Sequence, residues 1–320
     1  MNGSKKPENA RRKIAASEAM PNIRKILATT DFSSESRAGV RYAVDLAEKL
    51  SASVALLHVI EPPSHLSGVE SVVIARGDSE MEALARARLV TLAKREGGDA
   101  VSITLSVRTG KPFHEINTAA RESAADLIVI ATHGYTGFEH VLLGSTAERV
   151  VRHAPCSVLT VPTREFPKRT GKVSSFRLKK ILVPMDFSNL SKDALPWAIF
   201  LAEQFKAEVV LLHVVEKFPI DNLLGRELMS HTIVPLMKEA KANLQRAAAD
   251  LSKSIGLKIS ASVRDGKPHE EICAAAKSLG ADLIVLTTHG YTGLKHVWLG
   301  STAERVVRHA QRPVLVVRAV

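Results

Sequence analysis

Cysteine is scarce in this chain, and long apolar stretches are absent. The two cysteines, Cys156 and Cys273, have no C-x-x-C partner and no histidines at metal-ligand spacing. This excludes a disulfide framework and a cysteine-based zinc site, and it indicates reduced thiols. No apolar run approaches the roughly 20 residues that span a bilayer, and the N-terminus lacks the apolar core of a signal peptide. We therefore expect a soluble cytoplasmic protein that makes no membrane contact through a spanning segment.

Several catalytic signatures are missing as well. Gly110-Lys111-Pro112 lacks both the spacing and the hydroxyl residue of the phosphate-binding G-x4-G-K-[S/T] loop. The G-x-S-x-G element of serine hydrolases does not occur. Nucleotide hydrolysis would need a positioned base and usually a Mg²⁺ site, and we recognise no motif for either in the sequence. We expect a binding protein, with slow ATP hydrolysis as its upper limit as an enzyme.

What the chain does contain is a tandem duplication. The string LGSTAERVVRHA occurs at Leu143–Ala154 and again at Leu299–Ala310, and THGYTG precedes both copies at the same offset of 156 residues. Near the two starts, KILATTDFS at Lys25–Ser33 answers KILVPMDFS at Lys180–Ser188. A period this long predicts two copies of a whole domain and not a solenoid. The boundaries we expect are a tail over 1–22, a first domain over 23–162, a linker over 163–177 and a second domain over 178–320.

The net charge of +11 is concentrated outside these domains. The first 22 residues carry +3, and the stretch Pro162–Lys180 carries +6, so that about +2 remains for the two folded bodies. We therefore expect solvated basic segments and no nucleic-acid-binding surface, although a basic tail that touches nucleic acid or acidic lipid is the alternative.

Short apolar runs alternate with helical patterns in both repeats, which predicts an α/β fold. The expected strands are 26–30, 53–60, 101–107, 127–131 and 157–161 in the first repeat, and 181–185, 208–215, 258–263, 283–287 and 313–317 in the second. Helical patterns cover 36–50, 79–96, 112–124 and 145–153, and residues 61–78 suggest a long irregular loop. Strands that are apolar on both faces and separated by helices form parallel sheets. The prediction is two doubly wound, Rossmann-like sandwiches with five parallel strands each.

Ligands of such sheets bind beyond the carboxyl ends of the strands, where the strand order reverses. Asp31 follows the first strand, and Thr132-His133-Gly134 follows the fourth. The chain then reaches Gly144-Ser145, where a helix N-terminus offers free N–H groups and the positive end of its dipole to a phosphate. Asp31 would repel a phosphate, so its expected partners are the donors of a base or sugar. The arrangement predicts a nucleotide site.

Structural explanations exist for the same residues. Ser145–Glu148 and Ser301–Glu304 have the S-x-x-E pattern of a capping box. Gly134 and Gly137 fit a turn that needs positive φ. The last-turn residues Arg152, His153, Arg308 and His309 complement a helix dipole. His58 and His213 lie in strands and are expected to be wall or core residues, not ligands.

Together these segments resemble the universal stress protein family. The resemblance rests on KILxxxDFS, the strand end Leu57-His58-Val59, and THGYTG followed by LGSTAERVVRHA, in the same order in both halves. It identifies the chain as a tandem universal stress protein and implies a stress-response protein that binds ATP, with Mg²⁺ as a candidate companion. The resemblance also suggests a homo-oligomer, with a dimer as its simplest form, that pairs through the strands Ser157–Val161 and Val314–Val317.

The nucleotide-binding branch of the family carries G-x2-G-x9-G-[S/T]. Gly134 and Gly144-Ser145 match its later positions, but Ala131 and Thr287 replace the first glycine in the two halves. By resemblance, the first site comprises Asp31, Val59, Ala131, His133, Gly134, Gly144, Ser145 and Thr146. The second comprises Pro184, Asp186, Val214, Thr287, His289, Gly290, Gly300, Ser301 and Thr302. Because threonine is larger and stiffer than alanine, we expect a competent first site and place the second in question.

Two other functions remain open. The pockets could be vestigial in a structural or interaction protein that works through its edge strands, or the protein could be a weak ATPase. The sequence names neither the stress nor the client protein.

Overall fold

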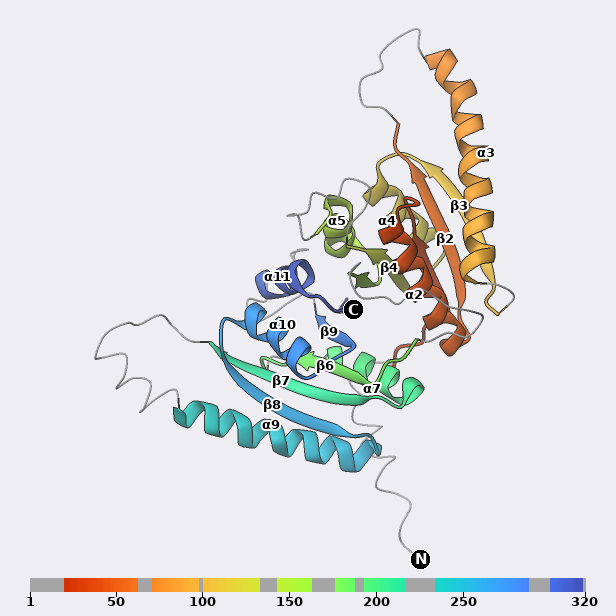
Figure 1. Ribbon diagram of the computed structural model, residues 1–320. Helices are drawn as coiled ribbons and strands as arrows, with labels where there is room; N and C mark the ends of the chain where they lie inside the picture. The colour runs from red at the N-terminus through yellow and green to blue at the C-terminus, as the bar shows by residue number, and fades with distance from the viewer. Residues whose placement is uncertain are drawn as a thin grey trace, which may run out of the picture. The chain divides into compact units, whose positions relative to one another are not determined.

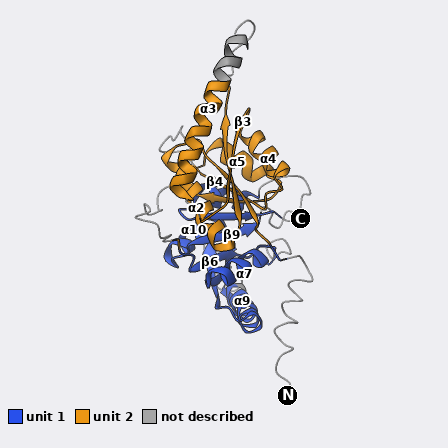
Figure 2. Ribbon diagram, turned by 90° about the vertical axis from the view of Figure 1, so that its right-hand side faces the viewer, with its two compact units in different colours: residues 1–21, 177–320 blue, residues 22–176 orange. Residues whose placement is uncertain are grey.

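The computed structural model describes residues 20–62, 71–97, 100–132, 143–162, 176–187, 193–216, 234–287 and 300–318. The chain divides into two compact units, one of residues 22–176 and one that includes residues 177–318 (Figure 2). Each unit is an α/β sandwich with helices on both faces of its strands (Figure 1).

The first unit contains five strands and four helices. They are β1 (Lys25–Thr29), α2 (Ser34–Leu50), β2 (Ser53–Ile60), α3 (Ser71–Glu96), β3 (Ile103–Thr109), α4 (Pro112–Glu122), β4 (Leu127–Ala131), α5 (Ser145–His153) and β5 (Ser157–Val161). The strand order is β3-β2-β1-β4-β5, and the described pairings are parallel. The order reverses direction between β1 and β4.

The second unit repeats this plan. Its elements are β6 (Lys180–Pro184), α7 (Ala194–Phe205), β7 (Glu208–Glu216), α9 (Val234–Ile255), β8 (Ile259–Gly266), α10 (Pro268–Ser278), β9 (Leu283–Thr287), α11 (Ser301–His309) and β10 (Val314–Val317). The order is β8-β7-β6-β9-β10, again with parallel pairs. The predicted fold, two doubly wound sandwiches of five parallel strands each, is confirmed.

The core follows from the apolar strands. All five residues of β4, β5 and β9 are buried, because helices cover both faces and leave no solvated side. The segment ADLIV, which occurs at Ala125–Val129 and again at Ala281–Val285, also ties strands together. Asp126 Oδ2 accepts hydrogen bonds from the backbone N–H groups of Arg24 and Lys25 at 2.8 and 2.9 Å. Asp282 does the same for Lys179 and Lys180. The start of β4 or β9 is thereby tied to the start of its neighbour.

The repeated Gly-Lys-Pro segment is a turn from strand to helix. Gly110 has φ +150 and Gly266 has φ +144, a region that side chains rarely enter, and the proline that follows occupies the first helical position of α4 or α10. This segment is therefore structural, as its lack of P-loop spacing suggested.

One predicted element is wrong. Residues 61–78 were expected to form an irregular loop, but α3 begins at Ser71 and includes Gly77. A single glycine costs a helix about 1 kcal/mol, which a helix of 26 residues tolerates. The predicted linker and basic tail fall largely outside the described residues.

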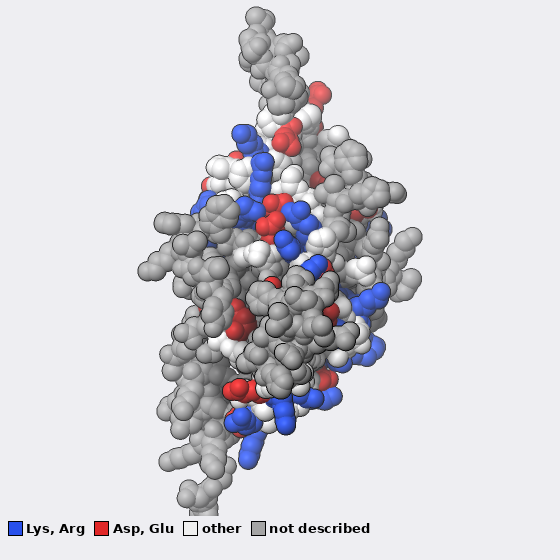
Figure 3. Space-filling view, turned by 90° about the vertical axis from the view of Figure 1, so that its left-hand side faces the viewer, with Lys and Arg blue, Asp and Glu red and all other residues white. Residues whose placement is uncertain are grey.

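On the face shown in Figure 3, the described Lys and Arg side chains lie among Asp and Glu side chains. Within the described part of the chain, none of the helices is both long enough and apolar enough to cross a membrane.

Candidate nucleotide site at the carboxyl edge of the sheet

The described residues of the predicted first site lie where the strand order reverses. The register pairs Ala28 with Val129, so that the ends of β1 and β4 lie level with each other. Thr29 pairs with Leu57, which brings Asp31, just beyond β1, beside the end of β2 that carries Val59. Because parallel strands end at one edge, three of the predicted residues, Asp31, Val59 and Ala131, share that edge.

The start of α5 is fastened to the same edge. The Gly144 N–H donates to the Thr132 carbonyl oxygen at 2.6 Å, and the Thr132 N–H donates to Val161 at 3.1 Å. A Cβ atom on Gly144 would lie 3.1 Å from that Thr132 oxygen, tighter than ordinary contacts. Glycine therefore allows the chain to pass close to the end of β4 just before the helix begins.

The capping boxes predicted at Ser145–Glu148 and Ser301–Glu304 are wrong. The N-caps are Gly144 and Gly300, which supply no side-chain oxygen, and Ser145 and Ser301 are already the first helical residues. The two glutamates instead form i,i+4 ion pairs with Arg152 and Arg308, at 3.2 and 3.0 Å. The N-cap glycines of α5 and α11 therefore have no side chain that would compete with a ligand for the first-turn N–H groups.

Asp31 is held by the turn that follows it. Its Oδ1 accepts two hydrogen bonds from Ser33, from the backbone N–H at 3.0 Å and from the hydroxyl at 2.5 Å. The same Ser33 caps α2, because its Oγ accepts the Ser36 N–H at 3.0 Å. The carboxylate is thus fixed relative to both the strand and the helix.

Next to Asp31, three side chains form a stack that sequence reasoning did not find. The Arg88 guanidinium lies 4.1 Å from the centre of the Phe32 ring, which lies 4.3 Å from the His58 ring. Burial lowers the pKa of His58, and the Arg88 cation acts in the same direction, while the bond to Thr30 and the charge of Asp31 oppose them. His58 is therefore a neutral wall residue, as its place in a strand suggested.

The second unit places its predicted residues in the same way. Pro184 ends β6 with Asp186 beyond it, Val214 lies in β7, Thr287 ends β9, and Gly300, Ser301 and Thr302 begin α11. Phe187 and His213 repeat the ring contact, at 4.5 Å. His133, Gly134, His289 and Gly290 lie outside the described residues.

The position that departs from the family motif packs on a helix. A Cβ on Gly39 of α2 would lie 3.7 Å from Ala131 Cβ, so the Ala131 methyl group faces α2. Ala131 is 7 % exposed and Thr287 is 8 % exposed. Ala194 stands in the second unit where Gly39 stands in the first. Both members of this helix–strand contact are larger in the second unit.

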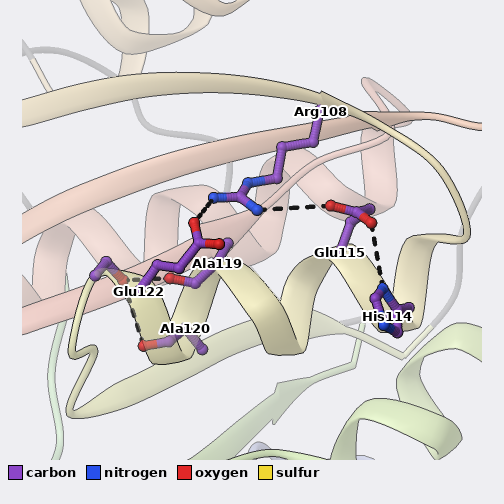
Figure 4. Close-up of polar contacts among 7 residues, drawn as sticks. Arg108, His114, Glu115, Ala119, Ala120 and Glu122 are labelled. Atoms are coloured by element: carbon purple, nitrogen blue, oxygen red, sulfur yellow. Dashed lines mark hydrogen bonds and ion pairs between the residues drawn. The ribbon is translucent and has the colours of Figure 1, made fainter.

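A second polar cluster lies between β3 and α4 (Figure 4), where the register pairs Arg108 with Val59. Arg108 pairs with Glu122 and, at 3.6 Å, with Glu115, whose other oxygen lies 3.2 Å from His114 Nδ1. The second unit has a counterpart in the Arg264–Glu271 pair at 3.4 Å. Partly exposed pairs of this kind stabilise little, and we interpret the cluster as a tie between strand and helix. Over the described ranges, no three metal-ligating side chains come together.

The sequence profile of the universal stress protein family matches this chain twice, at residues 22–162 and 177–318. The chain belongs to the universal stress protein family. A universal stress protein of Methanocaldococcus jannaschii is 39 % identical over 143 residues, which cover 44 % of this chain and 82 % of that protein. One from Mycolicibacterium smegmatis is 26 % identical over 300 residues, or 92 % of this chain and 96 % of its own.

A universal stress protein structure from Archaeoglobus fulgidus aligns with a TM-score of 0.64 at 21 % identity, over 92 % of this chain and 96 % of that one. That likeness supports the fold. With two family matches in one chain, the tandem organisation of this universal stress protein is confirmed.

Proposed function

We propose that the first unit of this universal stress protein binds an adenine nucleotide, with ATP as the expected ligand, and acts as a nucleotide-dependent regulatory module in a stress response. The observation that carries the proposal is the 2.6 Å hydrogen bond from the Gly144 N–H to the Thr132 carbonyl, which holds the start of α5 beside the end of β4. Backbone N–H groups at a helix N-terminus bind phosphate.

The opposite end of the proposed site supplies an acceptor. Asp31 lies one strand away from β4, at the end of β1, and Ser33 holds its carboxylate in place. A fixed carboxylate accepts hydrogen bonds from a ribose hydroxyl or a base amino group and disfavours phosphate. A ligand that satisfies both ends carries donors at one end and phosphates at the other, as a nucleotide does.

Magnesium would arrive with the phosphates of ATP. Over the described residues, no three side chains of the metal-ligating kinds come together at this edge.

The test measures ATP binding to the full chain by calorimetry, with matched variants of the two units. Asp31→Ala is expected to weaken the stronger binding event by about 10- to 100-fold, the value of hydrogen bonds to a charged group. Asp186→Ala, the equivalent change in the second unit, is expected to leave that event within twofold of the unaltered protein. Chromatography of small molecules released by denaturation should also detect co-purified adenine nucleotide.

Two results would contradict the proposal. A chain that releases no nucleotide and shows neither heat nor thermal stabilisation with ATP and Mg²⁺ does not bind it. Stronger dependence of binding on Asp186 than on Asp31 would reverse the order of the two sites.

The predicted self-association concerns other parts of the fold. The prediction rests on the valine-rich strands β5 and β10. We propose a homodimer as the assembled form, and light scattering that gives only the mass of one chain would refute it.

A further inference from the structure

Thr30 joins the end of β1 to its surroundings through every polar atom that it has. Its backbone N–H donates to the Leu57 carbonyl at 2.9 Å, and its own carbonyl accepts from His58 Nδ1 at 2.8 Å. Its hydroxyl oxygen accepts from the Phe32 N–H at 2.9 Å and lies 3.0 Å from Ser36 Oγ. Thr30 is buried, so these bonds do not compete with water.

The hydroxyl contacts lead to Asp31. Ser36 Oγ donates to the Ser33 carbonyl at 3.2 Å, which leaves the Thr30 hydroxyl as the donor to Ser36. The Ser36 N–H donates to Ser33 Oγ, which in turn donates to Asp31 Oδ1. A continuous series of hydrogen bonds therefore runs from Thr30 through Ser36 and Ser33 to the Asp31 carboxylate.

The Thr30 hydroxyl also contacts the turn directly. Phe32 has φ +66, a conformation that is uncommon for a bulky residue, and Thr30 Oγ1 binds the N–H of that same residue. Strained backbone persists where its surroundings over-determine it. The Thr30 hydroxyl thus supports the turn from both sides, through Phe32 directly and through Ser36 in α2.

The second unit is a natural comparison. Met185 replaces Thr30 and keeps both backbone bonds, to Leu212 at 2.7 Å and from His213 Nδ1 at 2.7 Å. Its thioether has no O–H to donate and is at most a weak acceptor. The backbone connections are therefore the same in the two units, and the hydroxyl connections belong to the first.

Phe187, the counterpart of Phe32, has φ +62 although Met185 precedes it, so the turn itself forms without the hydroxyl. We infer that Thr30 is a positioning residue of the first nucleotide site, whose hydroxyl supports the Ser36 and Ser33 hydrogen bonds and thereby aims the Asp31 carboxylate at the ligand. The inference rests on the proposed function. It also supplies a reason, separate from Ala131 and Thr287, for unequal sites in the two units.

The decisive experiment is a double-mutant cycle on the full chain, measured as the dissociation constant for ATP. Asp186→Asn is present throughout, so that the first unit dominates the signal. Thr30→Val, which removes the hydroxyl at nearly constant volume, is expected to weaken ATP binding about tenfold. Thr30→Ser, which keeps the hydroxyl, should stay within threefold of the parent.

The cycle separates positioning from general damage. If Thr30 acts through the carboxylate, Thr30→Val in an Asp31→Asn background causes no further loss beyond twofold. A tenfold loss in that background as well, or a Thr30→Val protein that binds ATP like its parent, overturns the inference.

A ligand-free measurement covers the case in which the proposed function fails. The amide proton of Phe32 is expected to exchange with solvent at least tenfold faster in Thr30→Val than in the unaltered chain, and Thr30→Ser should retain the protection. If the unaltered chain binds no ATP, the proposed function is refuted, while the exchange rates still decide whether the Thr30 hydroxyl binds the Phe32 N–H. Equal Phe32 exchange in all three proteins refutes the role of Thr30 by itself.

Discussion

The ion pair between Arg41 and Glu96 offers the sharpest stability test of the first unit. Glu96 is the last residue of α3, and its side chain is 2 % exposed. Arg41 in α2 reaches it through two nitrogen atoms, with Nε 2.9 Å from Oε2 and Nη2 3.4 Å from Oε1. Arg95 adds a longer contact at 3.5 Å from a largely exposed position.

The change Arg41→Ala should lower the free energy of unfolding of the first unit, because Glu96 would lose the Arg41 cation that offsets two unfavourable features of its position. The carboxylate is buried, and it stands at the negative end of a helix dipole. Removal of one partner of a buried pair costs about 3–5 kcal/mol, and the remaining contact with Arg95 favours the lower end, about 3 kcal/mol. Replacement of both partners by leucine should cost less than about 1 kcal/mol, because it leaves no buried charge. The second unit has Pro196 at the position of Arg41, so the fold does not depend on this pair.

Tryptophan placement makes the assay specific to each unit. Both tryptophans, Trp197 and Trp298, belong to the second half of the chain, so that their fluorescence reports the unfolding of that unit. Circular dichroism reports both units. In urea, Arg41→Ala should move one dichroism transition down by about 1–2 M, for a slope of about 2 kcal/mol per molar, and leave the fluorescence transition in place.

The reasoning is refuted if the single variant unfolds within about 0.5 kcal/mol of the unaltered protein. It is refuted equally if the double leucine variant is as unstable as Arg41→Ala, since burial of an unpaired charge would then not be the cause.

Three further predictions use differences between the repeats. Asn117 is buried, and its Oδ1 finds no donor among the described residues. The change Asn117→Cys copies Cys273 of the second unit and removes this oxygen. It should raise the free energy of unfolding of the first unit, measured by circular dichroism, by about 1–2 kcal/mol. Burial raises the pKa of Cys273 to about 11, so its alkylation by iodoacetamide at pH 8 should be slow in the folded chain and fast in urea; equal rates would contradict this. Burial lowers the pKa of His269 below its ordinary value of about 6.5, and the Arg305 cation adds to this effect. The second unit should therefore lose stability as the pH falls below that value, which urea unfolding followed by tryptophan fluorescence can measure. The change His269→Phe, which copies Phe113 of the first unit, should reduce the loss.

Elements bounded by clear signals could be predicted from the sequence alone. β4, α5 and β5 begin and end where the apolar runs and the Gly144–Ser145 boundary placed them. The start of α3 could not be predicted in the same way, because glycine and proline in residues 61–78 favour a loop locally. The stability of a long helix depends on residues that a short window does not include.

In the candidate site, too, some residues could be predicted from the sequence and others could not. The shared edge of Asp31 and Ala131 was predictable because parallel strands must end at one edge, whereas Val59 was predicted from the family resemblance. The roles of Thr30, Ser36 and the Arg88–Phe32–His58 stack were not, because they depend on side-chain geometry between elements. Their one sequence signal is a strand-end histidine that recurs, His58 and His213, each 28 residues after the residue whose carbonyl it binds.

The differences between the two units are not scattered over the site. Gly144, Ser145 and Thr146 have identical counterparts, and both helices begin at the residue after glycine, so the phosphate half of the proposed site is duplicated.

Three replacements lie close together in the fold: Thr30 by Met185, Gly39 by Ala194, and Ala131 by Thr287. In the first unit these residues lie where β1 and β4 meet α2, and in the second unit where β6 and β9 meet α7. Helix α2 begins at Ser34, and α7 begins at Ala194, the counterpart of Gly39. Pro196 lies in its first turn, where the missing N–H is tolerated, and an earlier start would move this proline into the helix interior. Among the site residues that the structure describes, these replacements fall in the half that would hold the base and sugar. We therefore expect the two units to differ less in their affinity for inorganic triphosphate than in their affinity for ATP, and calorimetry with Asp31→Ala and Asp186→Ala variants can compare the two ligands directly.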